Sequence, residues 1–229
     1  MSANVQVCQL HDWAVVPYKA HVDRSGPREE ARILAEHFRY HRNVRTSASC
    51  PPWVLGQELG WIIASPLRIN FTPLNDIQVT VGDDDERTET SHLFARDQFW
   101  RRSEGYIALS RNDWLRTFQY RGKEGRWEAM FLPNGQGTVE WRLGWAIRIP
   151  ERYFLLVTAA GELEGITVPQ GVLTAQQANR TLDQGGFSIA VRPDRDVTVH
   201  RGQPIARIVL LSPDSLQTAL EETDLQGDE

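Results

Sequence analysis

The C-terminal half of the chain alternates between apolar and polar residues in short runs. Between residues 141 and 212, several runs place an apolar side chain at every second position, including Trp145, Ile147, Ile149, Val197 and Val199. A period of two is that of a β-strand, in which successive side chains point to opposite faces. Gly, Pro and Asp separate the runs, and P-N-G-Q-G at 133–137 is a strong turn signal. The pattern predicts a mainly β fold, either an antiparallel β-sandwich or a β-clip-like barrel.

Four stretches carry helix signals and are predicted to form accessory helices. In 27–42, Pro27 suits the first turn, Glu29 and Glu30 suit its positive end, and apolar residues fall on one stripe. We expect this helix to pack across one side of the sheets. The other three predicted helices cover 52–59, 111–119 and 213–222.

These elements are expected to form a single domain over 1–229. The β core is predicted at 60–211. An accessory part of strand and helix precedes it at 1–59, and a C-terminal helix with an acidic tail follows at 212–229.

Composition narrows the classes of partner. The formal net charge is −5, from 25 basic and 30 acidic residues, so we expect no nucleic acid as partner. No run of about 18 apolar residues is present, which predicts no membrane span, and residues 1–17 do not resemble a signal peptide. The two cysteines, Cys8 and Cys50, fit reduced thiols in a cytoplasmic protein.

The order of glycines, prolines and aromatic residues over 50–211 resembles a bacterial family known as domain of unknown function 6065. The resemblance is carried by Gly60-Trp61, Pro66, Ile149-Pro150, Tyr153, Gly171-Val172, Gly202 and Pro204. Gly and Pro mark backbone requirements rather than chemistry, so this resemblance implies an architecture and no activity.

A second resemblance is to the core of dUTPase and dCTP-deaminase-like proteins. It is carried by G-W-A-I-R-I-P-E-R-Y at 144–153, G-V-L at 171–173 and V-H-R-G-Q-P-I-A-R-I-V at 199–209. The resemblance implies a β-clip and a homo-oligomer, often a trimer. Hydrolytic members place an Asp and a Tyr just after the G-V turn, where this chain has Thr174, Ala175 and Gln176. A neutral Thr cannot act as a carboxylate base, so we do not expect dUTP hydrolysis.

Two histidines are the candidate metal ligands. His37 and His41 are four residues apart and share a face of the helix predicted at 27–42, a spacing that can place two imidazoles on one metal ion. The candidates for a third ligand are Glu36, Cys50, His92 and Asp97. The alternative is that both rings simply end the apolar stripe. We expect no cofactor, with a divalent metal at these histidines as the alternative, and we interpret the acidic run 83–86 as a solvated turn.

Aromatic residues, arginines and one amide-rich segment are the candidate ligand-binding residues. Trp61 and Trp141 either line an apolar pocket or pack in the sheet core. Arg68 and Arg148 either converge on a carboxylate or phosphate or lie on solvated outer faces. The segment 170–186 is interpreted as an adaptable binding loop or, equally, as a short helix at 174–182 over one end of the sheets. Its ligand-facing candidates are Gln170, Gln176, Asn179 and Arg180.

Three functions are consistent with this sequence. The leading hypothesis is an intracellular protein that binds a small polar molecule between the β core and 170–186, including an enzyme of bacterial specialised metabolism. The rival is a non-catalytic assembly protein that forms a homo-oligomer. The third is a metal-dependent enzyme that uses His37 and His41.

Overall fold

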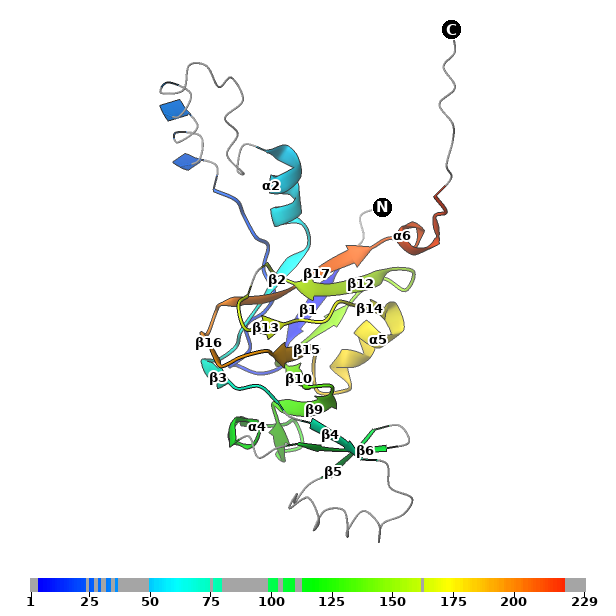
Figure 1. The fold of residues 1–229 in the computed structure, drawn as a ribbon. Helices are drawn as coiled ribbons and strands as arrows, with labels where there is room; N and C mark the ends of the chain where they lie inside the picture. The colour runs from blue at the N-terminus through cyan, green and yellow to red at the C-terminus, as the bar shows by residue number, and fades with distance from the viewer. Residues whose placement is uncertain are drawn as a thin grey trace.

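The fold is mainly β, and its strands pair antiparallel throughout the part that the structure describes (Figure 1). This computed structural model describes residues 4–23, 25–26, 29, 32–33, 36, 50–74, 76–79, 99–102, 105–109, 113–161 and 163–220. The predicted fold class is therefore confirmed.

Two four-stranded sheets form the centre of the molecule. One has the order β14-β12-β17-β2 and consists of Gly171–Thr174, Phe154–Ala159, Pro204–Leu211 and Trp61–Ala64. The other has the order β13-β15-β10-β9 and consists of Ile166–Thr167, Ser188–Pro193, Thr138–Arg142 and Phe131–Gly135. A single hydrophobic cluster takes Leu155 and Ile208 from the first sheet and Trp141 and Ile189 from the second. Across the described strands no sheet closes into a barrel.

Smaller sheets surround this centre. β1 (Gln6–Gln9) pairs with β11 (Trp145–Arg148), and β16 (Val197–Val199) pairs with β3 (Ile69–Phe71). β7 (Gln119–Arg121) pairs with β8 (Trp127–Ala129). β6 (Gly105–Leu109) lies between β4 (Asp76–Val79) and β5 (Phe99–Arg102). The turn predicted at 133–137 joins β9 to β10 and has positive φ at Gly135, Gln136 and Gly137.

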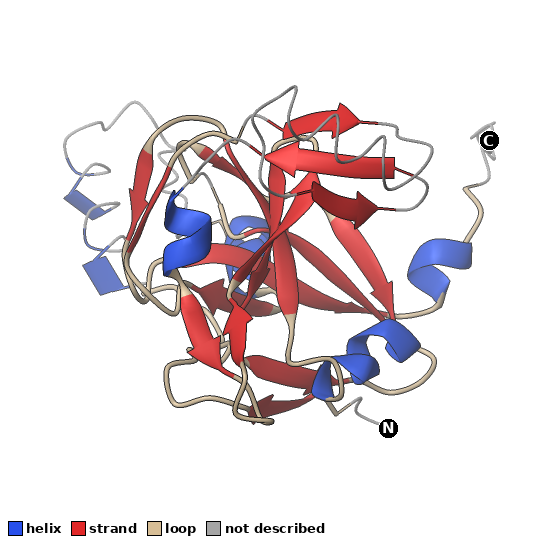
Figure 2. Ribbon diagram, turned by 90° about the horizontal axis from the view of Figure 1, so that it is seen from below, coloured by secondary structure: helices blue, strands red, loops and turns tan. Residues whose placement is uncertain are grey.

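The helices are short and lie around the sheets (Figure 2). They are α2, α4, α5, the 3-10 helix η2 and α6, with bounds Pro51–Glu58, Asp113–Thr117, Ala175–Asn179, Arg180–Leu182 and Asp214–Gln217. The helix predicted at 52–59 is confirmed. The helix predicted at 27–42 lies mostly outside the described residues, although residues 29, 32, 33 and 36 are helical.

Two predicted helices are shorter than the sequence suggested. The helix predicted at 111–119 ends at Thr117, because Gln119 already belongs to β7 and pairs with Ala129 of β8. The helix predicted at 213–222 ends at Gln217, and Leu216 and Leu220 are both exposed. A helix without a packed apolar face gains little from tertiary contacts, and so short a helix is marginal in water.

An arginine from the sheet holds the C-terminal end of α2. Arg207 of β17 is buried, and its Nη1 lies 2.9, 2.8 and 2.6 Å from the backbone oxygens of Gly56, Gln57 and Leu59. A cation at this end of a helix satisfies carbonyls that have no partner within the helix. Gly60 follows with φ +70°, and a Cβ there would stand 2.1 Å from the backbone oxygen of Ile208. This contact therefore places α2 directly against β17.

Candidate functional site

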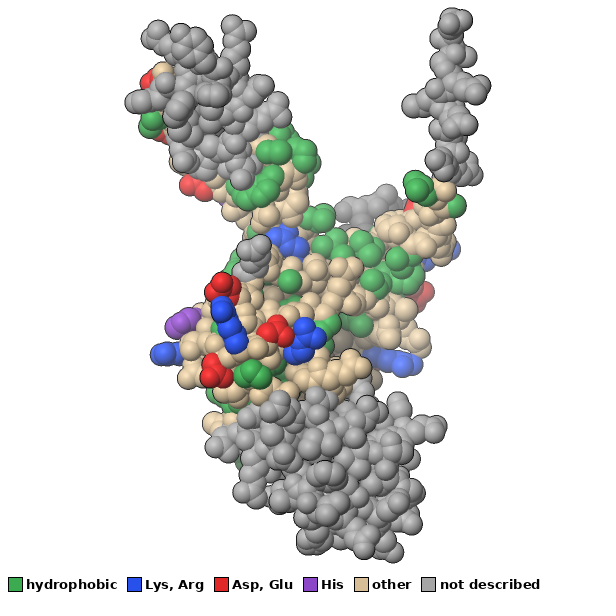
Figure 3. Space-filling model, viewed as in Figure 1, with side chains coloured by type: hydrophobic (Ala, Val, Ile, Leu, Met, Phe, Trp, Pro, Cys, Tyr) green, Lys and Arg blue, Asp and Glu red, His purple; other side chains and the backbone are tan. Residues whose placement is uncertain are grey.

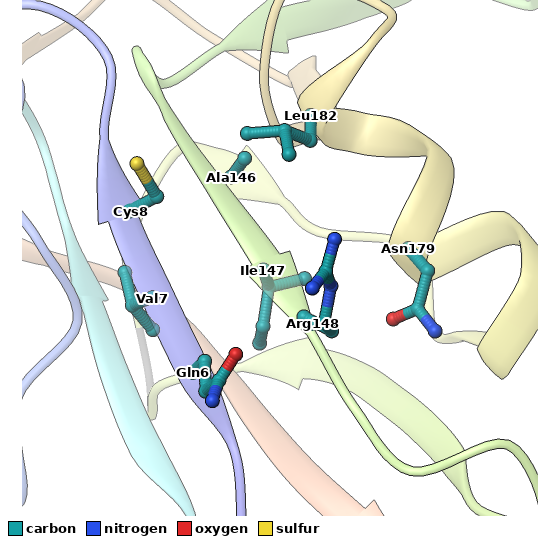
Figure 4. Close-up of a pocket in the computed structure, with 8 residues that line it drawn as sticks. All are labelled: Gln6, Val7, Cys8, Ala146, Ile147, Arg148, Asn179 and Leu182. Carbon is teal, nitrogen blue, oxygen red and sulfur yellow. The ribbon is translucent and has the colours of Figure 1, made fainter.

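A pocket lies where the two-stranded sheet β1-β11 meets α5 and η2 (Figure 4). Its volume is about 380 Å³, and the residues that line it are Gln6, Val7, Cys8, Ala146, Ile147, Arg148, Asn179 and Leu182. We call it the β1–α5 pocket. In the strand register, Gln6 lies opposite Arg148 and Cys8 lies opposite Ala146. Directly opposed residues share a face of a sheet, so these four side chains lie on the same face.

Side chains of α5 and η2 replace a neighbouring strand along β11. The backbone N–H of Ile149 donates to Asn179 Oδ1 at 2.8 Å, and Asn179 Nδ2 donates to the carbonyl of Ile149 at 3.1 Å. The backbone N–H of Ile147 donates to Thr181 Oγ1 at 3.1 Å, and that hydroxyl donates to the carbonyl of Ala178 at 2.7 Å. Because β1 pairs with the other edge of β11, both edges of this strand are satisfied. These hydrogen bonds hold α5 and η2, on one side of the pocket, against β11.

The start of α5 explains why segment 170–186 is regular. Thr174 is the N-cap: its hydroxyl accepts from the N–H of Gln177, and the Gln177 side chain accepts from the N–H of Thr174. This reciprocal capping box satisfies two backbone donors at the first turn. The adaptable loop is therefore wrong for 171–182, and the alternative of a short helix holds. Thr174 and the buried Ala175 therefore form the start of this helix.

The lining of the β1–α5 pocket combines aliphatic side chains with amides, a thiol and a guanidinium. Ala146 and Leu182 supply aliphatic surface, and Gln6 supplies an amide. Arg148 is exposed and makes no hydrogen bond or ion pair with a described residue, in contrast to Arg192 and Arg195, which each meet a carboxylate. Among the described residues that form the lining, none is a His, Asp or Glu that could act as a general acid or base.

The structure brings together some of the predicted ligand-binding residues and separates others. Arg148 and Asn179 line the β1–α5 pocket, although both ends of the Asn179 amide already bond Ile149. Gln176 and Arg180 are exposed on α5 and η2, and Gln170 is exposed just before β14, all three beyond the lining. The sequence reasoning missed Gln6 and Cys8, because the pairing of β1 with β11 has no local signal. It also did not single out Leu182 of η2.

The remaining predicted residues lie elsewhere. Trp61 in β2 is half-buried, with Lys19 Nζ 4.3 Å from the ring centroid. Trp141 is 0% exposed and packs against Phe71 and Phe131, which favours the core interpretation. Arg68 lines a second pocket beside β3.

The predicted metal site cannot be placed. His37, His41 and the acidic run 83–86 lie outside the described residues. Within the described ranges, no three His, Cys, Asp or Glu side chains group closely enough to hold a metal ion.

A cluster of titratable side chains joins the N-terminal segment to the hairpin β7-β8. The His11 ring stacks on Trp13 with centroids 5.2 Å apart and meets Tyr120 edge-on at 4.9 Å. Tyr120 Oη donates to Glu128 Oε2 at 3.1 Å, and Arg142 Nη1 lies 2.7 Å from the same carboxylate oxygen. Burial raises the pKa of Tyr120 and lowers the pKa of His11 from 6.5. At neutral pH the phenol and the imidazole are therefore both uncharged.

No helix in the described part of the chain has the length and hydropathy that a membrane span requires.

Comparison with known proteins gives matches among solved structures alone. No protein-family model matches the chain and no curated protein matches it, so the resemblance to domain of unknown function 6065 finds no support. A variant dUTPase from phage phi11 of S. aureus is 10% identical, with a TM-score of 0.40 over 99% of this chain and 97% of that chain. A variant dUTPase of Staphylococcus bacteriophage 80alpha is 11% identical, with a TM-score of 0.37 over 99% of each chain. Similarity this low establishes neither the activity nor the ligand of this chain.

Proposed function

We propose that this protein binds a small organic anion in the β1–α5 pocket. The observation that carries the proposal is the Arg148 guanidinium, which makes no hydrogen bond or ion pair with a described residue and lies beside the Gln6 amide and the aliphatic Ala146 and Leu182. An arginine offers a rigid fork of donors that matches a carboxylate or phosphate group. The volume of about 380 Å³ lies near the lower end of the range of about 300–1,000 Å³ for small-molecule sites.

The proposal concerns binding and does not include hydrolysis of dUTP. The positions that follow Gly171-Val172 hold the N-cap of α5, and the lining offers an arginine, an amide and a thiol. Such groups hold an anion, but none of them is a carboxylate that could position an attacking water.

The direct test is a thermal-shift and calorimetric screen of carboxylates, amino acids and nucleotides, each paired with its neutral amide or nucleoside. A ligand that binds the folded state raises the melting temperature. We expect an anion to bind wild type and to bind Arg148→Gln at least about tenfold more weakly, since one charged contact is worth about 1.4 kcal/mol or more. The matched control is Arg126→Gln, because that side chain is 85% exposed on the β7-β8 hairpin, away from the pocket.

Cys8 provides an independent reporter of occupancy. It is exposed in the pocket lining, whereas Cys50 lies before α2 as an N-cap without a side-chain hydrogen bond. Serine is a favoured N-cap residue, so Cys50→Ser leaves one reactive thiol in a stable protein. The anion found in the screen should slow the labelling of Cys8 in this variant. A labelling rate that stays unchanged at a saturating concentration would place the ligand elsewhere.

A second candidate function is homo-oligomeric assembly, favoured by the outer face of the sheet β14-β12-β17-β2. Leu156 lies opposite both Val172 and Val209, in a row on the face that points away from Leu155 and the core cluster. Val172 is 42% exposed and Leu156 is half-buried, whereas Val209 is only 6% exposed. Figure 3 shows hydrophobic side chains gathered over β12, β17 and α2. Exposed apolar patches of this kind mark interaction sites.

Light scattering across a range of protein concentrations tests assembly. We expect wild type to associate through this face and Val172→Glu to remain monomeric, because a charge buried in an apolar interface has no partner. Gln176→Glu, on the exposed surface of α5, is the matched control and should associate as wild type does. A wild-type monomer at all concentrations would remove this candidate.

A further inference from the structure

A second pocket lies between β3 and α4, on a different part of the molecule from the β1–α5 pocket. It is lined by Arg68, Ile69, Asn70, Trp114, Thr117 and Phe118 and has a volume of about 400 Å³. We call it the Trp114 groove. Its walls include two aromatic rings, whereas the described lining of the β1–α5 pocket includes none.

The edge of β3 forms one side of the groove. Residues 68–70 are consecutive, and consecutive side chains of an extended chain point to opposite faces. Three such residues can line one pocket only along the edge of the strand. β16 pairs with β3 through Val197–Val199, and in the described sheets β3 has no strand on its other edge. The groove therefore meets main-chain polar groups as well as side chains.

The polar side chains at the mouth are available to a ligand. Arg68 is exposed and makes no hydrogen bond or ion pair with a described residue, whereas Arg142 meets Glu128 and Arg207 meets three carbonyls. Asn70 Oδ1 accepts from Thr198 Oγ1 at 2.8 Å, so the amide nitrogen is the group that Asn70 offers. Arg68 and Asn70 together present donors and no described carboxylate faces them in the lining.

The aromatic wall is fixed before any ligand arrives. Trp114 Nε1 donates to Thr72 Oγ1 at 3.2 Å. Its ring meets Phe71 and Phe131 edge-on, with centroids 5.1 Å apart in each case, and Phe118 packs on the same Phe131 at 5.8 Å. Because these rings are already ordered, little conformational entropy is lost from them when a ligand binds.

We propose that the Trp114 groove is a second binding site, for a small planar aromatic molecule that carries one carboxylate or phosphate group. The ring packs against Trp114 and Phe118, and the anionic group meets Arg68 and the Asn70 amide. Aromatic contacts and a forked cation are the two features that such a ligand requires. The site is independent of the β1–α5 pocket and shares no lining residue with it.

The test compares 2-naphthoate with 2-naphthamide, which have nearly the same shape and differ in charge. Binding to the whole protein is followed by calorimetry and by quenching of tryptophan fluorescence. We expect saturable binding of 2-naphthoate, at least about tenfold weaker binding by Arg68→Gln, and partial recovery in Arg68→Lys, which restores the charge without the fork. The neutral amide should bind wild type and Arg68→Gln equally. Phenyl phosphate in the same assay distinguishes phosphate from carboxylate as the preferred group.

Arg126→Gln is the matched control, because it removes an exposed arginine that belongs to neither pocket lining. It should bind 2-naphthoate at the groove as wild type does. Binding that falls in Arg148→Gln but not in Arg68→Gln would overturn the proposal and assign the probe to the β1–α5 pocket. An equal affinity for the acid and the amide, or no saturable binding, would overturn it as well. Neither Arg68 variant should change the melting temperature without ligand, because the side chain is exposed and makes no hydrogen bond or ion pair with a described residue.

Discussion

At the scale of single residues, buried polar side chains complete the backbone of this molecule. Thr181 and Arg207 are buried, and their hydrogen bonds go to backbone groups of β11, α5 and α2. Asn179 does the same for Ile149. A buried amide that loses such a partner carries its full desolvation cost, so these few side chains matter more to stability than their number suggests.

Thr181→Val should destabilise the protein by about 1–3 kcal/mol, because it keeps the shape and leaves the Ile147 N–H without its acceptor. Thr181→Ser keeps the hydroxyl and should cost clearly less. Urea unfolding monitored by circular dichroism measures both. Equal losses in the two variants would mean that the methyl group, rather than the hydrogen bond, stabilises this position.

His11 gives stability a dependence on pH. Burial lowers its pKa from 6.5, opposed by the nearby Glu128 and Asp12 and reinforced by Lys123. Below pH 6.5 the unfolded chain binds a proton more readily than the folded chain does, so this contribution to stability falls as the pH falls. Between about pH 7.5 and about pH 5.5, wild type should lose more unfolding free energy than His11→Phe, which retains a ring against Trp13. Parallel losses in the two proteins would rule out this role for His11.

At the scale of elements, α2 is held to the sheet by one side chain from another part of the chain. Three carbonyl oxygens near its C-terminal end surround Arg207 Nη1. The helix itself buries only Val54, so we infer that its position depends on this contact and on the close approach of Gly60 to β17.

Arg207→Met should cost about 2–3 kcal/mol and should loosen α2 before the sheets unfold. Arg207→Lys should keep most of the stability, because one ammonium group carries three donors and the three carbonyls face a single nitrogen. Hydrogen exchange over 51–59 reports the local opening. Protection that is the same in Arg207→Met and in wild type would contradict this account of how α2 is held.

Local patterns predicted elements well and predicted their partners poorly. Alternation at 145–149 identified β11 and the outward direction of Arg148, and Pro52 identified α2. The pairing of β1 with β11 depends on register between distant segments, so Gln6 and Cys8 could not be foreseen as pocket residues. Residue type likewise does not distinguish a core tryptophan from one in a pocket, and Trp141 is decided only by packing.

At the scale of the whole molecule, one hydrophobic cluster joins the two four-stranded sheets with β3, α4 and α5. It includes Phe71, Trp114, Trp141, Ala178 and Ile205. Both pockets lie at the margin of this cluster, where a peripheral element meets the sheets. The rigid centre therefore positions two separate pockets.

Unfolding should be a single cooperative transition, because separating either sheet exposes the shared cluster. Far-UV circular dichroism and tryptophan fluorescence should give coincident denaturant curves, since Trp141 and Trp145 are both fully buried in that cluster. Two resolved transitions would show instead that parts of the chain fold independently.

The pairing of β1 with β11 also has a consequence for how the protein is made. β1 leaves the ribosome early, yet its partner strand follows only after residues 10–144 have been synthesised. β1 therefore stays without its partner strand until β11 has been synthesised, and closing so long a loop is slow. The pocket also needs α5 and η2, which end at Leu182, and the central sheets need β17, which ends at Leu211. We therefore expect translation products that stop before residue 182 to lack the ligand affinity of the whole chain.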